Sequence, residues 1–134
     1  MRLSVVVLAA SIFAATMIAE PVVAANAPIE TVYTDLQTAV GKNVRMQDLE
    51  KAFKGCSASR GWKFQKVSSG NLIGKLIVRG KHYVEVAVKF NSKEYTITYR
   101  DSKNMKYDPE KQTIHRRYNS WVENLDNDVK FCLK

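Results

Sequence analysis

The sequence predicts an α+β protein in which two helices cover one face of a four-stranded antiparallel sheet, in the order α-β-β-β-β-α. Residues 62–100 alternate between apolar and polar side chains and are interrupted by short polar turns, as is typical of an antiparallel meander with one buried face. Residues 44–58 and 113–134 repeat apolar side chains at helical spacing. Because a sheet with one apolar face needs a cover, these two helices complete a two-layer sandwich.

Residues 1–25 have the layout of a cleaved export signal. Arg2 precedes an uncharged apolar run at residues 3–19, and small residues beyond it allow cleavage after Ala24 or Ala25. A membrane anchor is the alternative, but 17 residues lie at the lower limit of a bilayer span and no positive stop-transfer flank follows. We therefore expect an exported protein, periplasmic or secreted, with no transmembrane anchor after cleavage.

The exported part has the size and composition of one globular domain. Hydrophobic residues make up 46% of the sequence and charged residues 25%, values that exclude a disordered, collagen-like or disulfide-dense chain. Residues 26–43 are expected to be an extended lead-in, either a loop or a short edge strand. Residues 44–134 are expected to form a single α+β domain.

The first helix is expected to begin after Asn43 as its N-cap and to run to about Ala58. Asp48 lies early in this segment, where negative charge complements the helix dipole. One helical face carries four residues at steps of 3, 4 and 3: Met46, Leu49, Phe53 and Cys56.

Four strands and a second helix follow. The strands are expected at residues 62–67, 72–79, 82–90 and 95–100, with turns marked by Gly, Asn and Ser. The polar segment 101–112 is expected to be a linker loop, and the last helix is expected to begin near Thr113.

The two cysteines of the chain, Cys56 and Cys132, are candidates for a disulfide, because export places them in an oxidising compartment. Free buried thiols and an intermolecular bond remain alternatives. Four antiparallel strands would return the chain to the end at which the first helix delivers it. We therefore expect that the loop at residues 101–112 must cross the sheet if the bridge is to form.

Several segments resemble a family of small exported bacterial proteins, many described only as hypothetical proteins or putative lipoproteins. The resembling segments are Arg60-Gly61-Trp62, Arg79 with His82, Tyr95-x-Ile97-x-Tyr99, and Ile114-His115-x-x-Tyr118-Asn119-x-Trp121. The resemblance covers residues 44–129 and implies export and this fold, but no activity. This chain departs from the lipoprotein members because no cysteine follows its apolar run.

His82 and His115 are the two histidines of the chain, and they raise the alternative of a secreted hydrolase such as a ribonuclease. One histidine would act as base and the other as acid. In the simpler interpretation, His82 is hydrogen-bonded beneath the helices and His115 lies near a helix N-terminus. No spacing of residues indicates a metal site or a cofactor, and Asp101, Asn104 and Asp108 lack the order of a calcium loop.

The positive charge is concentrated in one part of the chain. The net charge is +8, yet residues 42–106 alone carry 15 basic and 5 acidic residues. Five cations are expected on the sheet face away from the helices: Lys63, Lys75, Arg79, Lys89 and Arg100.

This basic sheet face predicts a non-enzymatic binding module for an anionic envelope component or an acidic protein. Two segments partly match an RNA-binding strand motif, but the order of elements differs and export argues against a nucleic acid partner. A solvated face without a partner, in a purely structural envelope protein, is the competing interpretation.

Overall fold

The computed structural model describes residues 26–134, so the export signal predicted at residues 1–25 lies outside the described residues. The elements follow one another as β1 (Asn26–Pro28), β2 (Val32–Asp35), α1 (Leu36–Val40), α2 (Met46–Gly55), the 3-10 turn η1 (Ala58–Arg60), β3 (Lys63–Ser68), β4 (Asn71–Val78), β5 (His82–Phe90), β6 (Glu94–Lys103), β7 (Thr113–His115) and α3 (Arg117–Leu133). Within residues 26–134, no helix has the length and hydrophobicity needed to cross a membrane.

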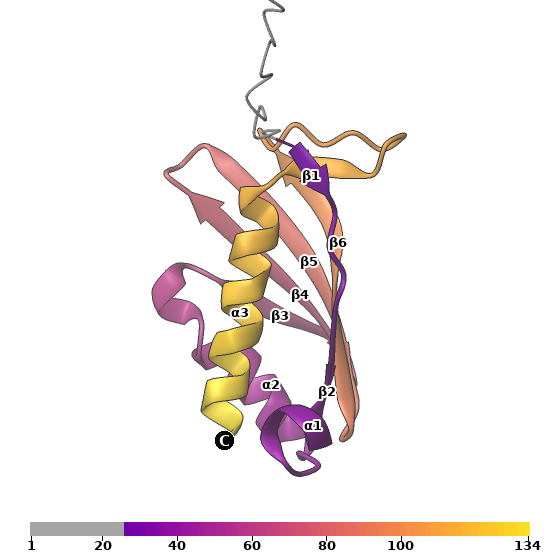
Figure 1. The fold of residues 1–134 in the computed structure, drawn as a ribbon. Helices are drawn as coiled ribbons and strands as arrows, with labels where there is room; N and C mark the ends of the chain where they lie inside the picture. The colour runs from indigo at the N-terminus through magenta and orange to yellow at the C-terminus, as the bar shows by residue number, and fades with distance from the viewer. Residues whose placement is uncertain (1–25) are drawn as a thin grey trace, which may run out of the picture.

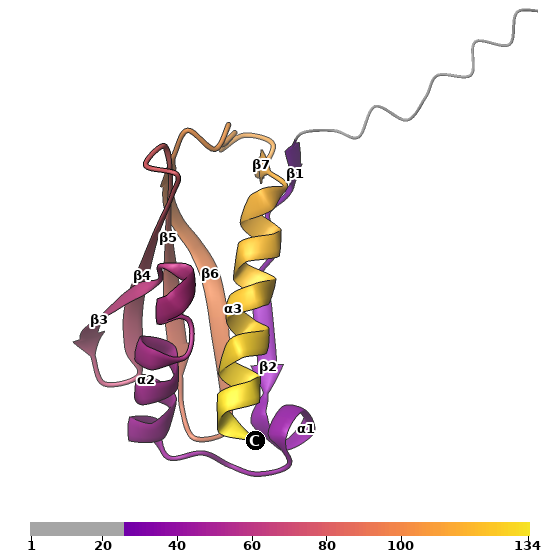
Figure 2. The ribbon, with the colours of Figure 1, turned by 90° about the vertical axis from the view of Figure 1, so that its left-hand side faces the viewer.

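An antiparallel sheet in the order β2-β6-β5-β4-β3 forms one layer, and α2 and α3 pack on one of its faces (Figures 1 and 2). The α+β class with an antiparallel sheet is therefore confirmed. The expected count of four strands and two helices is wrong, because the large sheet has five strands, β1 and β7 form a second small sheet, and α1 is a third helix.

The lead-in at residues 26–43 contains an edge strand, one of its two expected forms, but it is not extended throughout, because Leu36–Val40 forms the helix α1. β2 pairs with β6 along its whole length, from Val32 opposite Ile97 to Asp35 opposite Glu94. The Asp35 carboxylate then accepts the N–H of Thr38 and caps α1.

The core lies between the helices and the inward side chains of the sheet. The three inward valines of β5, which are Val84, Val86 and Val88, are completely buried. Leu49 and Phe53 of α2 are also completely buried, so two of the four residues of the expected helical stripe enter the core. The stripe of α3 is buried along its length, through residues that include Tyr118, Val122, Leu125 and Val129.

Both main helices begin later than expected. The N-cap of α2 is Arg45, not Asn43, because the N–H of Val44 donates to Ser92 and holds this part of the chain against the β5–β6 turn. The segment Thr113–His115 is a strand, not the start of the last helix. Its central residue, Ile114, is completely buried opposite Ala27 of β1.

Cys56 and Cys132 form the expected intramolecular disulfide, with an S–S distance of 2.07 Å and a Cα–Cα distance of 6.4 Å. The expectation that the loop at residues 101–112 must cross the sheet is wrong. The N–H of His115 donates to Met105, so α3 begins at the sheet end where β6 finishes. The bridge still forms because α2 has ten residues, about 15 Å, and brings Cys56 only part way along the sheet.

Candidate functional site

Four of the five predicted binding cations lie on the sheet face that points away from the core. Lys63, Lys75, Lys89 and Arg100 are exposed, and they alternate with or flank side chains that point into the core. Arg79 lies apart from them in the β4–β5 turn, where its backbone adopts a left-handed conformation with φ of 55°. The structure therefore does not bring the five cations together as one cluster.

Glu85 lies at the centre of this face and engages two of the cations. Its carboxylate accepts hydrogen bonds from Arg100 Nη1 and from the Tyr83 hydroxyl, and it lies 3.7 Å from Lys75 Nζ. Only 7% of Glu85 is exposed. Glu85 therefore offsets one of the two positive charges of Lys75 and Arg100. Lys63 stands opposite Lys75, and no ion pair joins it to a carboxylate among residues 26–134.

The hydrogen bond from Tyr83 holds the pKa of Glu85 below its ordinary value, and Arg100 and Lys75 lower it further against the opposing effect of burial. A carboxylate with a depressed folded-state pKa stabilises the fold above its unfolded pKa of about 4.3, and this contribution is lost as the pH falls through the folded pKa.

We expect Glu85→Gln to lower the free energy of unfolding by about 2 kcal/mol at neutral pH, since hydrogen bonds to a charged group are lost. Urea denaturation across the acidic range checks this prediction. The difference between wild type and variant should shrink as the pH falls below about 4. A difference that stays constant over that range would contradict the assigned role of the carboxylate.

A second group of cations gathers where β6 ends and α3 begins, and we call it the basic end. It comprises Arg79, Lys81, Lys103, Lys106, Arg116 and Arg117, all of them exposed. None of the six takes part in an ion pair with another described residue.

Hydrogen bonds join the three segments of the basic end. The Asn104 side-chain amide donates to the carbonyl of Lys81 at 2.8 Å, which ties the β4–β5 turn to the end of β6. The N–H of His115 donates to Met105 at 2.8 Å, which ties β7 to the same stretch. The cations of the three segments are thus held on one shared framework.

His82 and His115 both lie at the basic end. His82 donates from Nδ1 to the carbonyl of Asn104 at 2.9 Å, and His115 Nδ1 accepts the N–H of Arg117 at 3.2 Å. Burial lowers the pKa of His115, and the positive charges of Arg117, Lys106, His82 and Arg116 lower it further. The imidazole of His115 thus accepts the backbone N–H of the first residue of α3, and the nuclease alternative stays a prediction.

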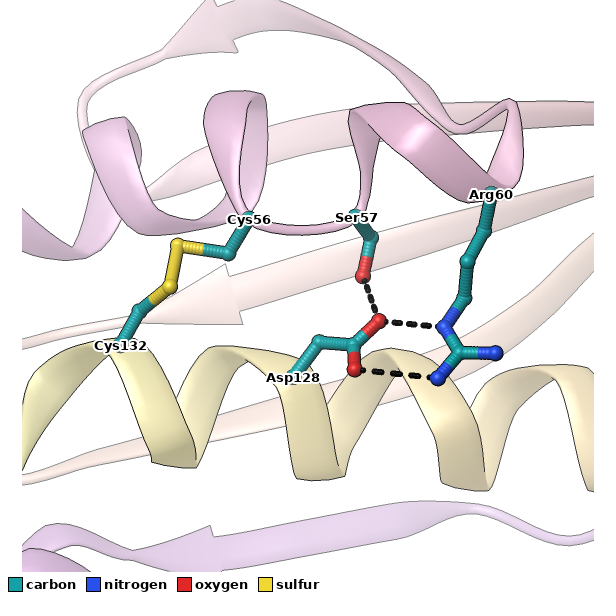
Figure 3. The surroundings of a disulfide bond; sticks show 5 residues. All are labelled: Cys56, Ser57, Arg60, Asp128 and Cys132. Carbon is teal, nitrogen blue, oxygen red and sulfur yellow. Dashed lines mark hydrogen bonds and ion pairs between the residues drawn. A yellow bond between two sulfur atoms is a disulfide. The ribbon is translucent and has the colours of Figure 1, made fainter.

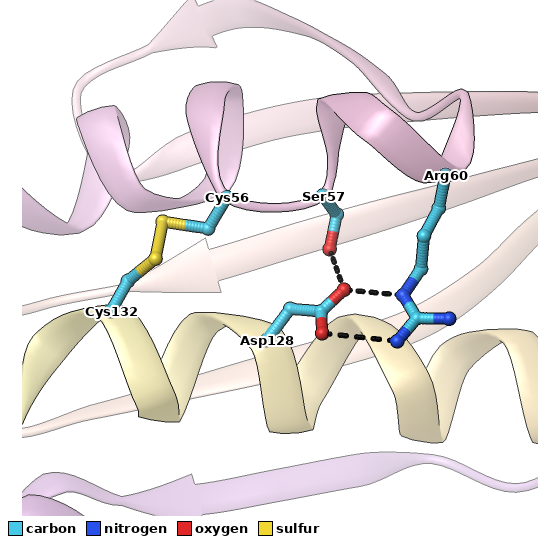
Figure 4. A network of polar contacts seen from close by, with 5 residues as sticks. All are labelled: Cys56, Ser57, Arg60, Asp128 and Cys132. Atoms are coloured by element: carbon cyan, nitrogen blue, oxygen red, sulfur yellow. Dashed lines mark hydrogen bonds and ion pairs between the residues drawn. A yellow bond between two sulfur atoms is a disulfide. The ribbon is translucent and has the colours of Figure 1, made fainter.

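A polar network beside the disulfide joins η1 to α3 (Figures 3 and 4). Asp128 accepts hydrogen bonds from Ser57 Oγ at 2.8 Å, from Arg60 Nε at 2.6 Å and from Arg60 Nη2 at 3.3 Å. Arg60, and then Ser57, hold the pKa of Asp128 below its ordinary value. Local sequence patterns do not reveal this role, because about seventy residues separate Asp128 from Ser57 and Arg60.

Glu85 was missed for a different reason. Its contacts depend on the register of the β4–β5 hairpin, which the alternation of one strand does not reveal. A turn between Val78 and His82 sets Lys75 directly opposite Glu85. Among the described residues, no group of three or more His, Cys, Asp or Glu side chains is arranged to hold a metal ion.

Comparisons with known proteins add no functional assignment to this geometry. The chain matches no protein-family model, no curated protein and no solved structure.

Proposed function

We propose that this protein is an exported, non-enzymatic interaction module that binds an anionic membrane surface of the cell envelope, with the basic end as its main contact. The observation that carries the proposal is the clustering there of six exposed cations without an ion-pair partner among the described residues. Crowded like charges raise the energy of the folded state, and an anionic surface removes that cost. Near an anionic lipid surface, each Lys or Arg contributes about 1 kcal/mol.

Apolar side chains beside the basic end favour a lipid surface over a free polyanion. Ile77 stands opposite Tyr83 in the last part of the β4–β5 ladder and is 62% exposed. Lys103 lies over the Tyr83 ring, 5.8 Å from its centroid, and Tyr107 is 38% exposed in the segment after β6. Cations flanked by aliphatic and aromatic side chains suit the headgroup region of a bilayer.

The position of Asn26 supports an orientation in which the basic end faces the membrane. β1 pairs with β7, and Asn26 lies opposite His115 while its side-chain amide donates to the carbonyl of Lys106. Residues 1–25 join the described chain at Asn26, so the predicted export signal connects to the protein at the basic end. Before cleavage, a signal inserted in the membrane would therefore hold this end towards the lipid.

Vesicle co-sedimentation tests the proposal. Wild-type protein should bind vesicles of phosphatidylcholine mixed with phosphatidylglycerol, bind pure phosphatidylcholine much more weakly, and detach as salt is added. The double variant Lys81→Gln/Arg116→Gln should lose about 2 kcal/mol of binding free energy, roughly a thirtyfold loss of affinity.

Two further double variants remove the same charge elsewhere. Lys42→Gln/Lys51→Gln removes one cation before α2 and one within it. Both line a groove that the last residues of α3 also line, and their loss should change the affinity for vesicles little. Lys63→Gln/Lys89→Gln acts on the open sheet face and tests the site predicted from the sequence. Equal losses in all three variants would mean that only net charge matters, and would overturn the basic end as the contact.

The hydrolase alternative has one observation in its favour, namely that both histidines lie at the basic end. Incubation of the purified protein with RNA, next to a His115→Ala variant, tests it. Cleavage by wild type alone would replace the binding proposal, and an absence of cleavage by wild type removes the alternative.

A further inference from the structure

A groove lies between α2 and the last residues of α3, next to the disulfide. Its volume is about 630 Å³, within the range of small-molecule sites. Both cysteines line it, together with Lys42, Arg45 and Lys51 from α2 and the residues before it. The basic end lies at the other end of α3, which has 17 residues and is about 25 Å long, so the two sites are separate.

The disulfide is accessible to a small molecule in this groove, mainly through one of its two residues. Figure 3 shows that the bridge joins the end of α2 to α3. Cys132 is exposed, whereas Cys56 is half-buried and packs against the core. Access decides which sulfur of a disulfide a thiolate attacks, so Cys132 receives the attack and Cys56 is the leaving group.

Positive charge lines the approach to the bridge. Arg45 is paired with Asp48 at 2.9 Å. Lys42 and Lys51 are exposed, and neither forms an ion pair within residues 26–134. Cations draw anionic reactants into a groove and stabilise the negative charge of a thiolate. The groove therefore favours a thiol that carries carboxylates over an uncharged thiol.

We propose that this groove is a site of reversible S-thiolation, at which a small anionic thiol opens the bridge and remains attached to Cys132. The thiolate sulfur of that compound forms a bond to Cys132 Sγ. The bond between Cys56 and Cys132 breaks, and its electron pair leaves on Cys56 Sγ as a thiolate. The incoming sulfur is oxidised and Cys56 is reduced, so the exchange consumes no other oxidant or reductant.

The exchange is reversible because Cys56 stays beside α3 when the bridge is open. Ser57, the next residue, donates to Asp128 of α3 at 2.8 Å, and Arg60 binds the same carboxylate. The Cys56 thiolate is thus kept within reach of Cys132 Sγ. Its attack there restores the bridge and expels the small thiol.

Glutathione, which carries two carboxylates, and 2-mercaptoethanol, which carries no charge besides that of its thiolate, test the proposal. The rate of bridge opening is followed by acid quenching and mass spectrometry of the purified exported protein. Lys42→Gln/Lys51→Gln should react with glutathione roughly tenfold more slowly than wild type, because an anionic reactant is no longer attracted. Its rate with 2-mercaptoethanol should change far less, and peptide mapping should locate the glutathione on Cys132.

Lys63→Gln/Lys89→Gln is the matched control, because it removes the same charge from the open sheet face, and it should react with both thiols at nearly the wild-type rates. Circular dichroism confirms that both variants are folded. Equal slowing with 2-mercaptoethanol, equal slowing in Lys63→Gln/Lys89→Gln, or attachment of glutathione to Cys56 would each overturn the proposal. These reactions contain no lipid, so none of the results bears on vesicle binding at the basic end.

Discussion

Replacing both Cys56 and Cys132 with serine is expected to lower the free energy of unfolding by about 4 kcal/mol. The bridge joins residues 76 positions apart, so its removal releases a long closed loop in the unfolded chain. A loss of this size is a large part of the 5–15 kcal/mol that is typical of folded domains. Denaturant unfolding of wild type and variant measures the difference directly.

Two controls make the result specific to the bridge. Reduced wild-type protein should unfold at the same denaturant concentration as the double variant, and each single serine variant should match the double variant. None of these changes removes the hydrogen bonds from Ser57 and Arg60 to Asp128, which hold η1 against α3 (Figure 4). A loss below about 1 kcal/mol would show that these contacts, rather than the bridge, secure α3.

Asp126→Ala is expected to cost about 3 kcal/mol of the free energy of unfolding, because it breaks a buried hydrogen-bond network. Asp126 is 8% exposed and accepts hydrogen bonds from the hydroxyls of Thr34, at 2.8 Å, and Tyr95. Lys130 pairs with its second oxygen at 2.8 Å. The variant would leave the Thr34 and Tyr95 hydroxyls buried without their acceptor.

Thermal or denaturant unfolding of Asp126→Ala, Asp126→Asn and Asn127→Ala separates the causes. Asparagine keeps an acceptor for the two hydroxyls and loses the pair with Lys130, so its loss should be intermediate. Asn127→Ala should stay within about 0.5 kcal/mol of wild type, as surface substitutions do. If Asp126→Ala were equally mild, the network would not contribute to the packing of α3 on β2 and β6.

The main parts of the fold were predictable because they repeat a pattern over many residues. The alternation in β4, β5 and β6 and the apolar stripe of α3 each extend over at least eight positions. β2 and β7 have four and three residues, too few to establish a period. They exist because Thr34 and Ile114 are buried by partners far along the chain, which local patterns do not record.

The polar residues that stabilise the fold and form the basic end could not be predicted for the same reason, since their neighbours are distant in sequence. Asp126 interrupts the apolar stripe of α3, and only the position of β2 and β6 explains it. The charge of residues 42–106 was visible in the sequence, but its distribution in space was not. Folding pairs Lys75 and Arg100 with Glu85, and gathers Arg116 and Arg117, from outside that range, at the basic end.

The central claim is that the basic end contacts an anionic lipid surface, and backbone amide hydrogen exchange of the wild-type protein with and without phosphatidylglycerol vesicles tests it most directly. We predict that vesicles slow exchange in the β4–β5 turn, after Lys103 and around Arg116, and leave the segment between α1 and α2 unchanged. Slower exchange confined to β3 and β4 would show that the open sheet face, and not the basic end, contacts the vesicles. No change in exchange anywhere would contradict membrane binding altogether.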